Sequence, residues 1–161
     1  MSEDKNNGTI DRLSAELTAP TIRERRAAAT DLGKTGNPAA IPALVTALKD
    51  PSPAVRTEVI LALGRIRDSA AVAGLVCALD DPEPVVRTAA ISALGMIRDR
   101  AASMALIRCL TDKDMAVRIG AAEVLGKLRD RQALSPLENL KHDPFGDVRE
   151  AATNAIKRID K

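Results

Sequence analysis

Aromatic residues are almost absent from this sequence of 161 residues. Phe145 is the only one, with neither tryptophan nor tyrosine present. Leucine, isoleucine, valine and alanine must therefore build the core, and small apolar side chains suit helices that pack closely on helices. Without aromatic side chains the surface has almost nothing on which nucleic-acid bases can stack, which argues against a single-stranded nucleic-acid partner.

Residue types that carry chemistry are also scarce. The single histidine, His142, precedes Asp143 in a predicted turn, where a solvent-exposed or capping role is expected. General acid–base catalysis usually needs a histidine or a carboxylate pair in a pocket, and a transition-metal site needs several converging ligands. The sequence therefore predicts no catalytic residue, no metal and no cofactor.

Long hydrophobic runs are missing as well. No stretch reaches the roughly 18 apolar residues of a membrane-spanning helix, and the first residues are polar and acidic. The net charge of +2 is too small to indicate a polyanionic partner by itself. We expect a cytoplasmic protein without a membrane partner.

The chain does have a repeat of 31 residues. Three sets of residues recur at this spacing: arginine at 25, 56, 87, 118 and 149, glycine at 33, 64, 95 and 126, and Asn or Asp at 37, 68, 99 and 130. A fixed period of this length indicates a solenoid or a propeller.

Each repeat contains two amphipathic helical patterns, called helix A and helix B. Helix A carries apolar residues such as Val55, Val59 and Leu63, and helix B carries Ile41 and Leu44, each set on one helical face. Helix starts are predicted from N-cap residues. The A helices would be capped by Asp50, Asp81 and Asp143, and the B helices by Asn37, Asp68, Asp99 and Asp130.

These patterns predict an all-α fold of ten helices. We expect a disordered tail over 1–8 and a single repeat domain over 9–161. The domain opens with a half-repeat cap over 9–18 and ends with an A helix over 144–159. Between them lie four A/B pairs, over 20–49, 51–80, 82–111 and 113–141. Both ends depart from the repeat, as the terminal units of a solenoid do, so we expect a complete array.

The repeated line resembles a known family. Asp-x5-Arg, followed by Ala-Leu-Gly-x-Ile/Leu-x-Asp, is similar to the short HEAT repeat of the phycobilisome-lyase (PBS lyase) type over about residues 9–160. The resemblance implies a right-handed α–α superhelix, armadillo-like in architecture, whose B helices line the concave face. Iron hydroxylases of this fold use repeated His-Glu pairs, and this sequence has none.

Each repeated arginine stands six residues after an aspartate or its equivalent. A planar guanidinium can bind a carboxylate of its own or the next repeat with two hydrogen bonds. We therefore prefer a structural role to a phosphate-binding track for this Arg–Asp ladder. Its residues are Asp50, Arg56, Asp81, Arg87, Asp112, Arg118, Asp143 and Arg149, with Arg25 ahead of them.

Charge is separated between the two edges of the array. The turns from A to B form a basic edge, and the turns from B to A are acidic. The helix dipole alone favours this arrangement, but a basic row also suits the docking of an acidic partner. The basic edge comprises Arg65, Arg67, Arg98, Arg100, Arg129 and Arg131.

The concave face holds the residues that change from repeat to repeat. Small side chains there fit either tight curvature or the recognition of a partner. The candidate binding residues are Thr46, Cys77, Met104, Arg108, Gln132 and Asn139. Cys77 and Cys109 lie on neighbouring repeats, about 8–10 Å apart, which exceeds the roughly 7 Å limit for a disulfide. Both thiols are expected to be free.

The sequence thus favours a monomeric, non-enzymatic adaptor that binds another protein, with Arg108 as a polar anchor and the basic edge steering an acidic partner. Replacing Arg108 and Cys77 by Glu is predicted to abolish binding. Two alternatives remain open: an accessory subunit similar to a phycobilin lyase, and an engineered or consensus-like scaffold without a natural partner.

Overall fold

The computed structural model describes residues 2–161, with side chains described from Gly8 onward. Over this range the chain is all-α, with ten α-helices. They are α1 (Ser2–Glu16), α2 (Ile22–Thr35), α3 (Ile41–Ala47), α4 (Pro53–Ile66), α5 (Val72–Ala78), α6 (Pro84–Ile97), α7 (Ser103–Cys109), α8 (Met115–Leu128), α9 (Leu134–Leu140) and α10 (Gly146–Ile159). The predicted all-α class is confirmed.

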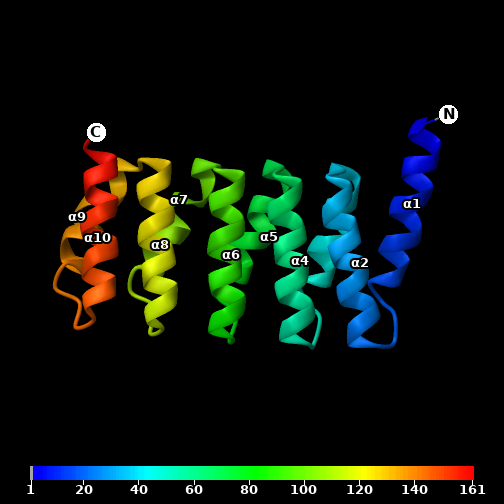
Figure 1. The fold of residues 1–161 in the computed structure, drawn as a ribbon, viewed down its shortest axis with the longest axis horizontal. Coiled ribbons are helices and arrows are strands. Elements are labelled where there is room, and N and C mark those ends of the chain that lie inside the picture. Colours follow the sequence, from blue (N-terminus) through cyan, green and yellow to red (C-terminus); the bar gives the residue numbers. More distant parts are fainter. Residues whose placement is uncertain (1) are drawn as a thin grey trace.

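The helices form a two-layered solenoid. The five A helices α2, α4, α6, α8 and α10 stand side by side in one row, with the B helices behind them (Figure 1). Each A helix packs on the A helix of the next repeat and on neighbouring B helices. The fold is therefore a HEAT- or armadillo-like array, as the resemblance implied.

Aliphatic side chains between the two layers make the core. The repeated leucines of the A helices, such as Leu63 and Leu94, are fully buried, and so are those of the B helices, such as Leu75 and Leu106. Ser103 occupies the place that Val72 holds one repeat earlier, and its buried hydroxyl has no hydrogen-bond partner among the described residues. The remaining core positions follow the predicted faces.

The A helices begin two residues later than predicted. Their N-cap residues are Thr21, Ser52, Glu83, Asp114 and Phe145, so Asp50, Asp81 and Asp143 are not N-caps. In the Asp-Pro-x-Pro turns, the second proline takes the first helical position, which its fixed φ favours. The aspartate before it accepts the N-cap residue's own amide, as in the 2.8 Å bond from Ser52 N–H to Asp50 Oδ1.

The B helices are capped as predicted but are shorter. Asn37, Asp68, Asp99 and Asp130 each accept the backbone N–H two residues ahead. The cap opens a three-residue 3₁₀ turn, and only seven α-helical residues follow. The 3₁₀ turns are η1 (Pro38–Ala40), η2 (Ser69–Ala71), η3 (Arg100–Ala102) and η4 (Arg131–Ala133).

Helix α1 holds the place of a B helix at the N-terminal end. Ile10, Leu13 and Leu17 are buried against the first repeat. Helical backbone begins at Ser2, earlier than Thr9, where order was expected to begin, and Met1 lies outside the described residues. Extending an existing helix adds one hydrogen bond for each residue ordered, so it costs far less than starting one.

The repeated glycines allow neighbouring A helices to approach closely. A Cβ on Gly126 would lie 2.8 Å from the Cα of Ala155, and one on Gly64 would lie 3.0 Å from the Cα of Ala93. The first distance would force the two helices apart, and the second is tighter than nearly all Cβ contacts in proteins. Both cysteines are free, as expected, with Cys77 exposed and Cys109 buried.

Candidate functional site

The Arg–Asp ladder ties each repeat to the next at the edge where B helices lead into A helices. Arg87 Nε donates to Asp112 Oδ2 at 2.9 Å and Nη2 to Oδ1 at 2.8 Å, while Nη1 donates to the carbonyl of Asp81 at 2.8 Å. One guanidinium thus joins two repeats. The other rungs are Arg25–Asp50, Arg56–Asp81 and Arg118–Asp143.

These pairs keep the aspartates charged. Burial raises the pKa of Asp112, but hydrogen bonds from Arg87 and from the Asp114 amide, together with the nearby positive charges, outweigh it and lower the pKa. The pKa values of Asp50, Asp81 and Asp143 are lowered in the same way. Each rung is therefore a neutralised, internally satisfied pair.

Arg149 differs from the other ladder arginines. It is exposed and keeps the backbone half of the pattern, donating to the carbonyls of Asp143 and Pro144 at 2.8 and 3.0 Å. No carboxylate among the described residues pairs with it.

The basic edge lies at the other end of the A helices. Arg65, Arg67, Arg98, Arg100, Arg129 and Arg131 are all exposed. Arg65 bonds Glu58 at 3.4 Å. The other five side chains have no hydrogen bond or ion pair with any residue that the structure describes. The structure thus brings the predicted row together on one edge and leaves most of it unpaired.

Shallow grooves separate the B helices along the rear of the array. Their volumes are about 530 Å³ between α1 and α3, 290 Å³ between α3 and α5, 70 Å³ between α5 and α7, and 820 Å³ between α7 and α9. An aspartate of the ladder lines every one of them. The repeat therefore offers the same type of site at each step, and the α7–α9 groove is the most spacious of the four.

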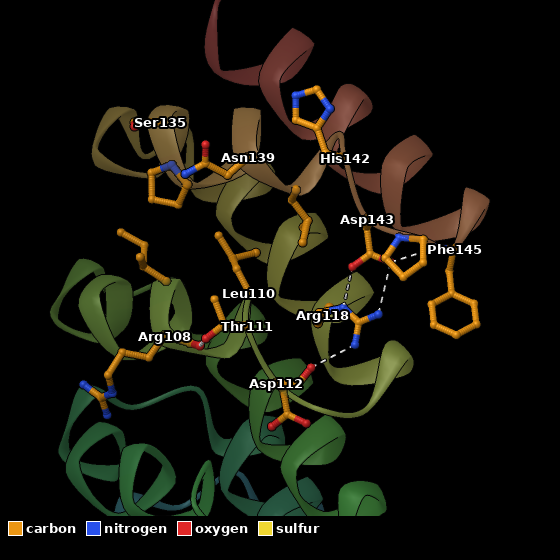
Figure 2. A pocket seen from close by; sticks show the side chains of 14 residues that line it. Arg108, Leu110, Thr111, Asp112, Arg118, Ser135, Asn139, His142, Asp143 and Phe145 are labelled. Carbon is orange, nitrogen blue, oxygen red and sulfur yellow. Dashed lines mark hydrogen bonds and ion pairs between the residues drawn. The ribbon is translucent and has the colours of Figure 1, made fainter.

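The α7–α9 groove combines apolar walls with free polar groups (Figure 2). Arg108 and Thr111 come from one repeat, and Asn139 and His142 come from the next. Phe145 forms part of the wall with 51% of its surface exposed. The Arg118–Asp143 rung lies beside it, and the Arg118 guanidinium carbon is 5.7 Å from the centre of the Phe145 ring, a distance at which a cation and an aromatic ring attract.

Several polar side chains in this groove have no partner. Arg108, Asn139 and His142 are exposed, and their side chains make no hydrogen bond or ion pair within residues 2–161. By contrast, Arg118 is already neutralised by Asp143 at 2.8 Å. A ligand entering the groove would thus meet Arg108 as an uncompensated positive charge.

The six predicted concave residues do not meet in one site. Arg108 and Asn139 line the α7–α9 groove, Thr46 lines the groove between α1 and α3, and Cys77 lines the one between α3 and α5. Met104 is 60% exposed and Gln132 is exposed, but neither lines any of these four grooves. Residues at the same position of successive B helices are one repeat apart, so they line different grooves and do not form a single site.

Sequence reasoning missed the part played by the turn after α9. His142 is exposed, as expected, but it also lines the α7–α9 groove, and Phe145, to which the sequence gave no site role, lines the same groove. One signal was available: Phe145 is the sole aromatic residue and occupies the N-cap position where other repeats have Ser52, Glu83 or Asp114.

Metal and membrane sites find no support in the described part of the chain. No group of three or more His, Cys, Asp or Glu residues there is placed to hold a metal ion. Within the same residues, no helix has the length and apolar character needed to cross a bilayer.

Stacked helix pairs with grooves between their B helices define an α-solenoid repeat protein. A family model of HEAT repeats matches residues 10–95 and again residues 72–157. The chain therefore belongs to the HEAT repeat family. No curated protein sequence matches it.

A structure similar to this one is that of the complex of CpcE and CpcF of phycocyanin lyase from Nostoc sp. PCC7120. The sequences are 27% identical with a TM-score of 0.79, and the match covers 93% of this chain and 64% of that chain. This chain thus spans less than two thirds of that protein's length. The predicted similarity to the PBS lyase type of repeat is confirmed.

Two further structures share the fold alone. A designed armadillo repeat protein in complex with the peptide (KR)4 is 19% identical with a TM-score of 0.68, covering 98% of this chain and 84% of that chain. Human deoxyhypusine hydroxylase is 17% identical with a TM-score of 0.58, covering 99% and 98%. Proteins with unlike roles therefore use this architecture.

Proposed function

We propose that the chain is a non-enzymatic scaffold that binds another protein on its B-helix face, mainly in the α7–α9 groove. One observation carries this proposal. The groove of about 820 Å³ is lined by the exposed Phe145 and by polar side chains that have no partner among the described residues. Partly exposed aromatic and arginine side chains of this kind often dominate protein–protein binding energy.

The groove also indicates the chemistry of the partner. Phe145, Pro136 and Ile107 offer an apolar surface, and Arg108 offers an unpaired charge. A segment that carries an apolar side chain beside a carboxylate would satisfy both. Asn139 and His142 are placed to bond its polar backbone.

Single substitutions test the groove. In a pull-down from the source lysate followed by titration of the purified partner, the wild-type chain is expected to bind and Arg108→Glu to lose binding by at least about tenfold, since a buried like-charge contact costs several kcal/mol. Cys77→Glu is the matched control. It adds the same charge in a different groove, and binding should persist.

Circular dichroism should show equal helicity in all three proteins. Undiminished binding by Arg108→Glu would remove the α7–α9 groove as the site. Loss of binding with Cys77→Glu alone would move the site to the groove between α3 and α5.

A second candidate function is an accessory role like that of a phycobilin lyase subunit. The similarity to the CpcE–CpcF complex favours it, and the free thiol of Cys77 is exposed. Cys109 is a poor nucleophile by comparison, because burial raises its pKa to about 11.

Mixing the chain with a bilin distinguishes the two candidates. An accessory lyase should shift the visible absorption spectrum of the bilin, and Arg108→Glu should reduce the shift. A spectrum that equals the sum of the separate components would contradict this role and leave the scaffold proposal unaffected.

A further inference from the structure

Three arginines on the basic edge adopt a backbone conformation that arginine disfavours. Arg67, Arg98 and Arg129 end their A helices in the left-handed region, with φ of 58°, 61° and 51°. Glycine is the usual residue at such a helix end because it has no Cβ to clash. The first repeat follows that rule, with Gly36 at φ 62°.

The helix dipole does not explain Arg67 and Arg129. A cation in the last helical turn with ordinary φ complements the dipole without strain, and Arg65 in α4 and Lys127 in α8 already stand there, whereas the last turn of α6, which Arg98 follows, has none. Replacing glycine by arginine at the next position adds charge at a conformational cost. To stabilise the fold, the arginine would need a hydrogen bond or ion pair from its guanidinium to another residue of the chain.

No such partner exists within the described residues. The side chains of Arg67, Arg98 and Arg129 are exposed and make no hydrogen bond or ion pair. The aspartates beside them are engaged in capping, since Asp68, Asp99 and Asp130 accept backbone amides of the 3₁₀ turns. Each turn still carries one more arginine than aspartate, because Arg65, Arg100 and Arg131 flank the row.

We propose that Arg67, Arg98 and Arg129 bind an extended acidic segment of a partner protein that presents a carboxylate at every third residue. Neighbouring packed helices lie about 8–10 Å apart. A polyproline II segment advances about 3.1 Å per residue and turns once every three residues, so each turn advances about 9 Å. Carboxylates three residues apart therefore match the arginines of successive repeats. This site lies on the A-to-B edge and does not depend on the α7–α9 groove.

A labelled peptide tests the proposed register. It has a proline-rich background with glutamate at every third position, and a control peptide of equal composition has its glutamates contiguous. Fluorescence anisotropy should show salt-sensitive binding of the spaced peptide, and weaker binding of the contiguous one. The triple variant Arg67→Gly/Arg98→Gly/Arg129→Gly should bind the spaced peptide about tenfold more weakly, since each exposed charge pair contributes a modest amount.

The same variant separates a binding role from a structural one. Glycine relieves the left-handed strain, so its melting temperature should equal or exceed that of the wild type. The control variant Lys49→Gln/Lys113→Gln/Lys141→Gln removes the same charge from the opposite edge and should leave peptide binding unchanged.

Three results would overturn the proposal. The first is equal peptide binding by the wild type and the triple glycine variant. The second is a fall in the melting temperature of that variant, which would make the arginines structural. The third is equally tight binding of a single-stranded oligonucleotide of the same charge, which would make the edge a general polyanion surface.

Discussion

The two edges of this solenoid join successive repeats by different means. At the B-to-A edge, arginine and aspartate pair across every repeat boundary, with bonds such as the 2.8 Å contact from Arg118 Nε to Asp143 Oδ2. At the A-to-B edge, close contact of Gly64 and Gly126 with the next helix replaces ion pairs. The ladder arginines at the B-to-A edge are paired with aspartates between repeats, whereas most arginines at the A-to-B edge are unpaired among the described residues.

Arginines that recur at the same spacing can therefore have different roles at the two edges. Arg87 and Arg98 belong to the same repeat, yet Arg87 is 4% exposed and fully bonded, whereas Arg98 is exposed and unpaired. Removing the first should damage the fold, and removing the second should damage only recognition. The following predictions test that division.

Acid should produce the largest effect, because it acts on all four rungs together. The folded pKa values of Asp50, Asp81, Asp112 and Asp143 are lowered from the ordinary 3.8. The ladder therefore stabilises fully above that value, and its contribution is lost as pH falls through the lower folded pKa values. Urea midpoints measured between pH 7 and 2 should fall steeply below about pH 4. A flat profile there would contradict the ladder's role.

Breaking one rung should have the next largest effect. Asp112→Ala leaves the buried Arg87 guanidinium without its carboxylate, and we expect a loss of about 3–5 kcal/mol in the free energy of unfolding. Asp31→Ala is the control, because its 2.9 Å pair with Lys34 is more than half exposed. That change should cost about 0–1 kcal/mol. Urea denaturation measures both, and similar losses would refute the distinction.

Adding a methyl group to a glycine at the A-to-B edge should have the third largest effect on stability. Gly126→Ala pushes a Cβ to 2.8 Å from the Cα of Ala155, and we expect a loss of about 1–3 kcal/mol from overpacking. Gly120→Ala lies in the same helix, and its Cβ would lie 3.5 Å from Ile91 Cγ2, an ordinary contact. Helix propensity should then stabilise it by up to about 1 kcal/mol. Thermal denaturation should show opposite signs.

Removing one free arginine should have the smallest effect on stability. Arg98→Gly relieves a positive φ of 61° but makes the unfolded chain more flexible, so the free energy of unfolding should stay the same or rise by up to about 1 kcal/mol. The free energy of unfolding, measured in urea, checks it. A loss comparable with that of Asp112→Ala would mean that both edges are structural.

The sequence predicted the architecture well because the repeat appears many times. The 31-residue period, the two helical faces and the B-helix caps such as Asp99 all lie where the structure has them. The A-helix starts were wrong, since Asp50 could serve either as an N-cap or as a turn residue two positions earlier. Local pattern cannot choose between these roles, because the choice depends on the arginine of the preceding repeat.

The candidate site was harder to predict than the fold. Helical periodicity placed Arg108 and Asn139 on one face, but the groove between them also needs Phe145 from the following turn. Groove volume depends on how two helices diverge, and residue spacing carries no information on that. The left-handed φ of Arg98 could not be predicted from the sequence either, since glycine would be the expected residue there.

The reach of each ladder arginine has a consequence for how the chain folds. Arg56 and Asp81 lie 25 residues apart, and the Arg26–Glu58 ion pair spans 32 residues, so even the ion pairs between repeats close short loops. Folding can therefore start in any repeat and spread to its neighbours without waiting for the two ends to meet, which makes it rapid. Unfolding should run the other way, starting from α1 and α10, each of which packs on a neighbouring repeat on one side only within the described residues. Amide hydrogen exchange should then be slowest in α6, at the middle of the array.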